Sequence, residues 1–277
     1  MSRIVILKPD QSVELNPVDS GFAYGYGLFE TIRLRAGRLC FWQAHWDRLA
    51  HSAASLGFHF KLEMPAVLDA IRSLCEAVCW QDGLIKLSLM SENGGSVLYV
   101  YGRPELSGTQ SARLKLDLKH PLNERSVLAG HKTHNYMEHM LLLKAARERG
   151  YYDTLRVNGA GHLAESCVGN IFFIKGQTLA TPSLESGILP GVVRGAILNL
   201  ARSSIFNEAI SVEAGVYDPA FLKSCDAVFL TNSSVGILPI ELINTEADAT
   251  IHFDSEGHRL VQSLQQLLRE KEEAESV

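Results

Sequence analysis

The segment AGHKTHNYMEHMLLLKAARERG, residues 129–150, begins as a cluster of polar side chains and continues as an amphipathic helical pattern. Its first half places Lys132 among two histidines, an asparagine and Tyr136. A lysine held in a partly desolvated pocket can lose its proton, and the free amine can form a Schiff base with a carbonyl compound. A structural lysine with local hydrogen bonds at a helix N-terminus would have the same sequence. The segment therefore admits two interpretations, a reactive amine and a structural lysine.

The residues before this segment alternate between helical and strand patterns. A helix from about Gln43 to Leu56 is expected because Ala44, Leu49 and Ala53 recur at helical spacing. The other elements predicted in this half are a strand at 3–7, a strand within 27–37, a helix that starts near Pro65, two strands within 83–104 and a strand at 112–122.

Residues 118–130 form a connection, and they give the predicted domain boundary: an N-terminal α/β domain over 1–119 and a second domain over 120–277. The second domain is expected to be richer in hairpins, with turns at Asn158-Gly159 and at Lys175-Gly176. Its later elements are predicted as a helix at 190–203, a strand at 208–217, a short helix at 219–225, a strand at 226–234 and a terminal helix at 258–277. This order predicts two successive α/β layers.

The composition indicates an ordinary soluble protein. The 277 residues are 46% hydrophobic and 21% charged, and the net charge of −5 does not favour nucleic acid as the main partner. Five scattered cysteines predict neither a disulfide framework nor a metal site, and they suit a reducing compartment. The apolar run Ile4–Leu7 is too short for a signal peptide, and no stretch is long enough to span a bilayer. We therefore expect a cytoplasmic protein without a membrane segment.

A carboxylate in the second half of the chain has two interpretations. Glu165 lies between apolar strand patterns, and a carboxylate buried there must be paired or protonated. One specific partner is the ring nitrogen of pyridoxal phosphate, which a carboxylate keeps protonated so that the ring withdraws electrons. A solvated carboxylate in a hairpin would have the same sequence.

Three further groups of residues suit a phosphate. Gly187, Pro190 and Gly191 precede a helix, whose N-terminal N–H groups can bind an anion. Residues 231–234, TNSS, place short polar side chains at the end of a strand, and Arg48 is a possible phosphate ligand on a helix. Ordinary turns and a solvated arginine would look the same. Together, however, these groups and Lys132 supply the parts that would hold pyridoxal phosphate.

Five segments in this order resemble the class IV, fold-type IV pyridoxal-phosphate enzymes, which comprise branched-chain and D-amino-acid aminotransferases and aminodeoxychorismate lyase. The segments cover most of residues 19–240 and read DSGFAYGYGLFETIRLRAGRLCFWQAHWDRL, HKTHNYMEHMLLLKAARE, HLAESCVGNIFFIKG, SGILPGVVRGAIL and LTNSSVGILPI. The resemblance implies an N-terminal two-layer α/β domain, a C-terminal pseudo-barrel domain, a small-molecule substrate and a homodimer.

The resemblance also implies residue roles. Lys132 would bind the cofactor covalently and act as acid and base, Glu165 would pair with the pyridine nitrogen, and Tyr136 would lie near the cofactor's phenolic oxygen. The phosphate would be held by Arg48, by the backbone at Val192 and Val193, and by the hydroxyls of Ser233 and Ser234.

Within the family, the segment TNSSVGILPI is most similar to that of aminodeoxychorismate lyases. These enzymes convert 4-amino-4-deoxychorismate to 4-aminobenzoate and pyruvate for folate synthesis. Two features depart from that pattern. Glu30 stands where some lyases have threonine, and the segment LSLMSENGGSV, residues 87–97, lacks an arginine that many lyases and D-amino-acid aminotransferases have for a substrate carboxylate. Lys86, Arg33 or Arg103 could replace that arginine. An aminotransferase that acts on branched-chain or D-amino acids is the alternative, and a non-catalytic protein that binds pyridoxal phosphate is a further one.

Overall fold

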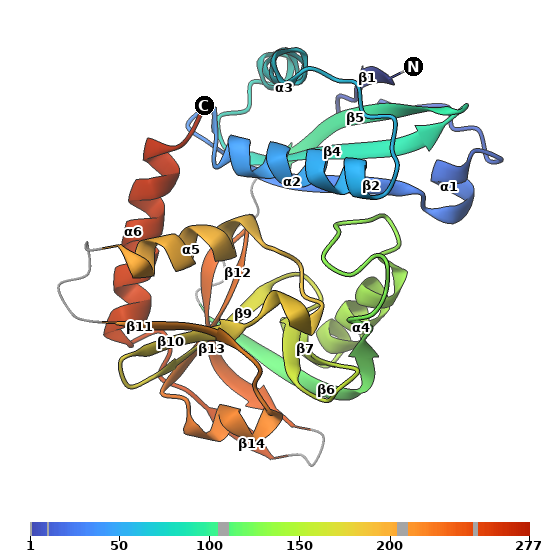
Figure 1. The fold of residues 1–277 in the computed structure, drawn as a ribbon. Coiled ribbons are helices and arrows are strands. Elements are labelled where there is room, and N and C mark those ends of the chain that lie inside the picture. The colour runs from blue at the N-terminus through green and yellow to red at the C-terminus, as the bar shows by residue number, and fades with distance from the viewer. Residues whose placement is uncertain (1, 10, 105–110, 204–209, 246–248) are drawn as a thin grey trace. The chain divides into compact units, whose positions relative to one another are not determined.

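The computed structural model describes residues 2–9, 11–104, 111–203, 210–245 and 249–277. Figure 1 shows the chain as a ribbon of mixed helices and strands. The family-like α/β fold expected from the sequence is present, with one open sheet and one closed barrel.

The contacts of the chain form two compact units. Unit 1 contains Met1–Ser107, His131–Tyr136 and Glu272–Val277, and unit 2 contains Gly108–Gly130 and Met137–Lys271.

Unit 1 is built on a five-stranded sheet with the order β1-β5-β4-β2-β3. Its strands are β1 (Ser2–Ile6), β2 (Gly27–Arg35), β3 (Arg38–Leu39), β4 (Gly83–Glu92) and β5 (Gly95–Pro104), and its helices are α1 (Ser20–Tyr24), α2 (Trp42–Ser55) and α3 (Met64–Val78). β1 runs parallel to β5. The pairs β5–β4, β4–β2 and β2–β3 are antiparallel. The strands and helices predicted from the sequence of this half are confirmed.

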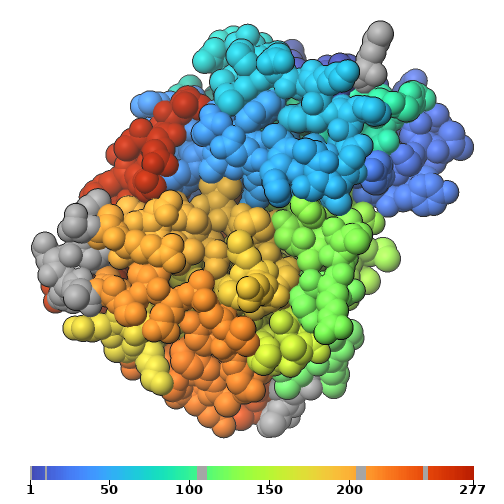
Figure 2. All heavy atoms as spheres, in the orientation of Figure 1, coloured from blue at the N-terminus to red at the C-terminus, as the bar shows by residue number. Residues whose placement is uncertain are grey.

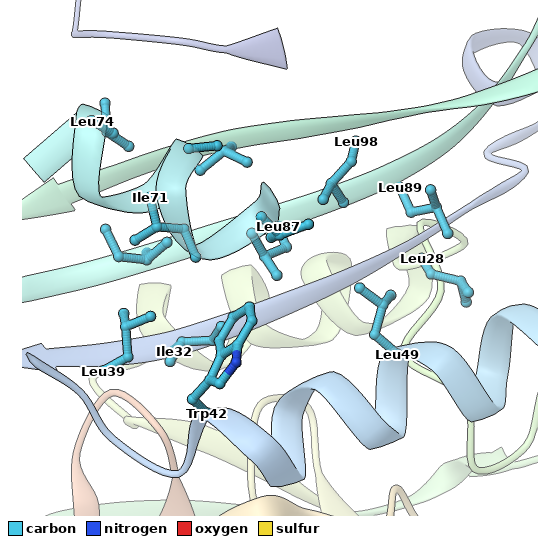
Figure 3. Packing of buried hydrophobic residues seen from close by; sticks show 14 of the residues in the cluster. Leu28, Ile32, Leu39, Trp42, Leu49, Ile71, Leu74, Leu87, Leu89 and Leu98 are labelled. Atoms are coloured by element: carbon cyan, nitrogen blue, oxygen red, sulfur yellow. The ribbon is translucent and has the colours of Figure 1, made fainter. Parts of the chain in front are cut away.

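The core of unit 1 lies between one face of this sheet and the helices α2 and α3. Leu28 and Ile32 lie an even number of residues apart on β2, so their side chains point to the same face of the sheet. Figure 3 shows them with Trp42 and Leu49 of α2 in one packed layer.

The predicted apolar stripe of α2 is partly wrong. Leu49 and Ala53 are buried, but Ala44 is exposed. Because the helix begins at Trp42, the face that meets the sheet passes through Trp42 and His45, which are both buried. A buried histidine on this face is a feature that apolar periodicity could not predict.

Unit 2 is built on nine strands in the order β11-β10-β9-β12-β13-β6-β7-β8, with β14 paired to β13. β8 pairs with both β7 and β9, so the six strands from β9 to β8 close into a barrel. The strands are β6 (Ala112–Leu122), β7 (Asp153–Asn158), β8 (Leu163–Ser166), β9 (Asn170–Lys175), β10 (Thr178–Pro182), β11 (Ser211–Gly215), β12 (Ala227–Asn232), β13 (Gly236–Asn244) and β14 (Thr250–His252).

The helices of unit 2 are α4 (Met137–Glu148), α5 (Val192–Arg202) and α6 (Arg259–Ala274, whose last residues belong to unit 1), with short 3₁₀ helices at Leu184–Ser186 and Pro219–Ser224. α5 lies on the face of unit 2 that Figures 1 and 2 show. Its residues Asn199 and Arg202 are exposed.

Most of the predicted elements of unit 2 are confirmed, including both hairpin turns. The predicted strand at 208–217 is observed at Ser211–Gly215, and residues 208 and 209 lie outside the described residues. β13 was not predicted from the sequence, because Pro239 interrupts its pattern. Its backbone nevertheless pairs with β12 on one side and with β6 on the other.

The predicted domain boundary between residues 119 and 120 does not coincide with the limits of the compact units. β6 crosses that boundary and pairs with β7 and β13, so residues 112–119 belong to unit 2. Residues 131–136 pair with β2 and therefore belong to unit 1. Backbone hydrogen bonds, which composition does not reveal, account for both differences.

Among the described residues, no helix combines the length and the hydropathy needed to cross a membrane.

The core of unit 1 gives a stability prediction. Replacing Leu74 of α3, which is fully buried, by alanine removes packed apolar atoms and leaves a cavity. We expect the free energy of unfolding to fall by about 2–5 kcal/mol, measured by denaturant titration. Ser73→Ala, at an exposed position of the same helix, is the control and should change it by no more than about 0.5 kcal/mol. Equal effects of the two changes would contradict the assignment of this core.

Candidate active site

Residues 131–136 extend the edge of the sheet in unit 1. The N–H of Phe29 donates to the Lys132 carbonyl and the N–H of His134 donates to the Gly27 carbonyl, both at 2.9 Å. Leu28 and Thr133 form the bridge between these bonds. Gly27 is required here, because a Cβ atom at this position would overlap the His134 ring. The segment is therefore held beside β2 by an isolated antiparallel bridge.

The structural alternative, a lysine at a helix N-terminus, does not describe Lys132. α4 starts at Met137, five residues later, and the backbone of Lys132 is fixed by β2. This pairing gives the lysine a defined direction.

The ammonium group of Lys132 lies over aromatic rings. Its Nζ is 4.3 Å from the centroid of the Phe29 ring and 5.4 Å from that of Tyr136. The Nζ of Lys86 on β4 is 5.2 Å from the same Phe29 ring. Burial lowers the pKa of Lys86, and the charge of Arg103 lowers it further. Two amines thus share one aromatic side chain on this face of the sheet.

Two histidines hold the segment on both sides of Lys132. His134 Nε2 is 2.6 Å from the hydroxyl of Ser88 on β4, and His131 Nδ1 is 2.9 Å from the hydroxyl of Ser52 on α2. These contacts tie the polar cluster to a strand and to a helix of unit 1. The two histidines therefore position the lysine segment.

Arg48 is held by a buried ion cluster. Its Nε and Nη2 donate to the two carboxylate oxygens of Glu30 at 2.8 and 2.6 Å, and His45 Nδ1 is 2.7 Å from Glu30 Oε2. Glu30 and His45 are each 1% exposed. Burial alone would raise the pKa of Glu30, but the charge and hydrogen bonds of Arg48 and His45 outweigh it and lower the pKa to about 2. Burial lowers the pKa of His45, against the opposing effect of Glu30.

In unit 2, Glu165 is buried at the end of the barrel strand β8. Its carboxylate accepts the N–H of Leu189 at 3.2 Å through Oε1 and 3.1 Å through Oε2. Its Oε2 also accepts from Asn170 Nδ2 at 2.9 Å. The side chain is therefore paired rather than solvated, as the functional interpretation of the sequence required.

The start of α5 lies next to this carboxylate in unit 2. Gly191 is the residue before the helix, and Val192 and Val193 form its first turn, whose N–H groups have no acceptor within an α-helix. A Cβ atom at Gly191 would overlap the amide oxygen of Asn170. Glycine is therefore needed at position 191 to leave room for Asn170, and the N–H groups that follow it are of the kind that can bind an anion.

A tight turn carries the two predicted serines. Asn232 Oδ1 accepts the N–H groups of Ser234 and Val235 at 2.8 and 3.0 Å, and Asn232 Nδ2 donates to the Val168 carbonyl at 3.1 Å. Ser233 and Ser234 are half-buried on this turn. The nearby Thr231 hydroxyl is buried and has no hydrogen-bond partner among the residues that the structure describes. Such a group fits a site that takes a polar ligand.

The predicted site residues are thus found in two clusters, one in each unit. Unit 1 brings Lys132 and Tyr136 together over Phe29 and places Arg48 in the ion cluster of Glu30. Unit 2 contains the remaining predicted residues, which are Glu165, Val192, Val193, Ser233 and Ser234.

The sequence analysis assigned no role to Asn170, His45 or Phe29. His45 precedes Arg48 by three residues, so the two share a helix face, and this spacing could have indicated a common partner. Asn170 follows Glu165 across a short turn and directly precedes the apolar run IFFI. A polar residue at such a position could have indicated a functional role. Phe29 carries no such signal, because it reads as an ordinary strand residue.

Each cluster by itself contains groups that suit one part of a cofactor with an aldehyde, an aromatic ring nitrogen and a phosphate. In unit 1, a lysine can bind the aldehyde carbon. In unit 2, a buried carboxylate can pair with a protonated ring nitrogen, helix N–H groups can bind phosphate, and the buried Thr231 hydroxyl is a polar group that a ligand would complete.

Comparisons with known proteins agree with these features. The model of the family described as amino-transferase class IV matches residues 27–243. An aminodeoxychorismate lyase of Bacillus subtilis is 28% identical over 281 aligned residues, which cover 95% of this chain and 91% of that protein. The crystal structure of a 4-amino-4-deoxychorismate lyase of Pseudomonas aeruginosa has a TM-score of 0.78 and 26% identity, with 94% of this chain and 96% of that chain covered.

A branched-chain amino acid aminotransferase of Thermobaculum terrenum, solved in its pyridoxal-phosphate form, has a TM-score of 0.81 over 95% of this chain and 90% of that chain. At 22% identity this similarity concerns the fold.

The ion cluster of unit 1 gives a pH prediction. The pKa of Glu30 is lowered from 4.5 to about 2 in the folded protein, so its stabilising effect is present above about pH 4.5 and is lost as the pH falls toward 2. This change in the pKa of Glu30 corresponds to roughly 3 kcal/mol in the free energy of unfolding. Across this range, the free energy of unfolding should fall by about that amount more in the native protein than in Glu30→Gln.

Denaturant titrations at a series of pH values measure the difference. The matched control is Glu76→Gln on α3, where the carboxylate is exposed and its removal should leave the pH dependence unchanged. If Glu30→Gln and the native protein lose stability in parallel, the Glu30 carboxylate is not held in the charged form by Arg48 and His45.

Proposed function

The chain belongs to the amino-transferase class IV family, and on this basis we propose that it is a pyridoxal-phosphate-dependent aminodeoxychorismate lyase. The reaction converts 4-amino-4-deoxychorismate to 4-aminobenzoate and pyruvate. The similarity to lyases of Bacillus subtilis and Pseudomonas aeruginosa over nearly the whole chain supports this activity. The observation that carries the proposal is the position of Lys132, whose amine lies over Phe29 beside Tyr136 on a segment fixed by β2.

The family pattern assigns each site residue to one part of the cofactor. Lys132 binds the aldehyde carbon, Glu165 pairs with the ring nitrogen, and Tyr136 lies near the phenolic oxygen. The phosphate is held by Arg48, the N–H groups of Val192 and Val193, and the hydroxyls of Ser233 and Ser234. When bound, pyridoxal phosphate supplies a ring that withdraws electrons from the substrate carbon next to the nitrogen.

Lys132 performs the proton transfers in this proposal. As a free amine, Lys132 would take the proton from the substrate carbon next to the nitrogen. The carbon–oxygen bond to the enolpyruvyl group breaks, the ring becomes aromatic, and the departing group receives a proton and leaves as pyruvate. Phe29 contributes an apolar wall beside the amine, which keeps water away from it.

An aminotransferase is the second candidate, and Glu30 is the observation that favours it. The aminotransferases of the family often have glutamate at this place, and here Glu30 has a structural function as the bidentate partner of Arg48. In that reaction Lys132 would move a proton between two carbons and release a keto acid. A protein that only binds pyridoxal phosphate would need no positioned amine, so Lys132 disfavours that alternative.

We further infer a homodimer in the cytoplasm. Val18, Phe22 and Tyr24 at the start of unit 1 are 79, 57 and 78% exposed, and large apolar side chains grouped on a surface are typical of protein interfaces. No disulfide joins the five cysteines, which suits a reducing compartment.

The product formed from 4-amino-4-deoxychorismate tests the proposed function. The protein loaded with pyridoxal phosphate should release 4-aminobenzoate, followed by its fluorescence, and pyruvate in equal amounts. Lys132→Ala should reduce the rate by at least about 100-fold, because it removes the acid and base. Lys144→Ala is the matched control, since this lysine is 75% exposed on α4, and it should retain the native rate.

If the loaded protein forms neither product but converts branched-chain or D-amino acids to keto acids, the lyase is wrong and the aminotransferase is correct. If the native protein shows no near-visible absorption band after addition of pyridoxal phosphate, both enzyme assignments are wrong.

A further inference from the structure

Asn170 is a buried polar residue that has no role in the proposed chemistry. It is the first residue of β9, it is 4% exposed, and a four-residue turn separates it from Glu165. The turn is closed by the N–H of Ser166, which donates to the Gly169 carbonyl at 2.8 Å. A buried side-chain amide is costly unless its polar atoms are paired, so its contacts indicate what it does.

The amide nitrogen of Asn170 has two acceptors. Nδ2 donates to Glu165 Oε2 and to the carbonyl of Leu189, each at 2.9 Å. Leu189 in turn donates its N–H to the carboxylate of Glu165. These bonds form a closed ring of three residues, in which the backbone of Leu189 and the carboxylate of Glu165 are both fixed by one amide group.

The amide oxygen of Asn170 lies on the other side, against Gly191. A Cβ atom added at Gly191 would overlap Asn170 Oδ1, and the nearest atom outside Asn170 would be the Cβ of Arg194 at 3.3 Å. Gly191 immediately precedes α5, whose first N–H groups belong to Val192 and Val193. Asn170 thus contacts the carboxylate with one end of its amide and the start of the helix with the other.

We propose that Asn170 is a positioning residue that sets the carboxylate of Glu165 and the N-terminus of α5 in a fixed relation to each other. The proposal rests on the proposed function, in which Glu165 takes the ring nitrogen and the helix N-terminus takes the phosphate of one rigid cofactor. Such a cofactor binds well only if both groups are at the correct separation, and a single amide that touches both provides it. The same rigidity explains why the residue before the helix is glycine.

The first experiment compares three variants as apo-protein titrated with pyridoxal phosphate. Asn170→Ala removes both donors, and Asn170→Asp keeps the shape but replaces the donors by a charge that repels Glu165. Thr181→Val is the matched control, because it removes a buried hydrogen bond of 2.8 Å from β10 to the Ile171 carbonyl on the barrel strand β9. We expect cofactor affinity to fall by about 10-fold to 100-fold in Asn170→Ala and further in Asn170→Asp, but by less than about twofold in Thr181→Val.

A spectroscopic measurement separates positioning from loss of stability. The near-visible absorption of the bound cofactor depends on whether its ring nitrogen is protonated, which Glu165 controls in the proposed function. At saturating cofactor, the pH dependence of this absorption should change in Asn170→Asp and stay native in Thr181→Val. Unfolding midpoints of all three variants show whether their stabilities are comparable.

A double-mutant cycle tests the contact with Gly191. Gly191→Ala alone should weaken cofactor binding about as much as Asn170→Ala, because its methyl group displaces the amide. When Asn170 is already alanine, the added methyl group meets no amide oxygen, so Gly191→Ala should then cost less than about threefold. The helix-capping cost of alanine is present in both backgrounds and cancels in the cycle.

Three results would overturn the proposal. If native protein binds pyridoxal phosphate but Asn170→Ala and Thr181→Val bind it with the same affinity, Asn170 is not a positioning residue, although the proposed function stands. Independent, multiplicative effects of the two changes in the cycle would show that Asn170 and Gly191 are not coupled. If the native protein binds no pyridoxal phosphate, the proposal fails together with the proposed function.

Discussion

The two backbone hydrogen bonds between β2 and the lysine segment are the constraint on which the rest of the site in unit 1 depends. They hold residues 132–134 beside β2 at an isolated bridge, which gives the side chains there defined directions. Lys132 and His134 both lie against the Phe29 ring, whereas Thr133 is buried. A flexible loop could carry the same residues, but it could not hold an amine over one chosen ring.

Buried polar groups organise both units. In unit 1, Glu30 occupies a strand position whose neighbours on the same face are apolar, its charge is balanced by Arg48, and the His45 ring contacts it. A buried ion pair adds little net stability relative to apolar residues, but loss of one partner is expensive. The cluster therefore fixes the direction of Arg48. In unit 2, Asn170 does the same for Glu165 through neutral hydrogen bonds.

The strands, helices and hairpin turns of this chain were largely predictable, because their signals are local. Leu49 and Ala53 follow the helical period, and Asn158-Gly159 marks a tight turn. What local patterns could not supply is pairing between distant residues. The contact of Lys132 with β2 spans about a hundred residues of chain. The contact between Asn170 and Gly191 likewise joins a barrel strand to a separate segment. The candidate site was found through its residue types, and its geometry required the tertiary structure.

Lys132 and Lys86 lie near the same Phe29 ring, so the central claim is that Lys132, and not Lys86, binds the cofactor. Borohydride reduction of the protein loaded with pyridoxal phosphate makes the lysine–cofactor bond permanent, and peptide mass spectrometry then locates it. The account predicts one modified residue per chain, Lys132. Modification of Lys86, or of exposed lysines in proportion to their accessibility, would contradict it.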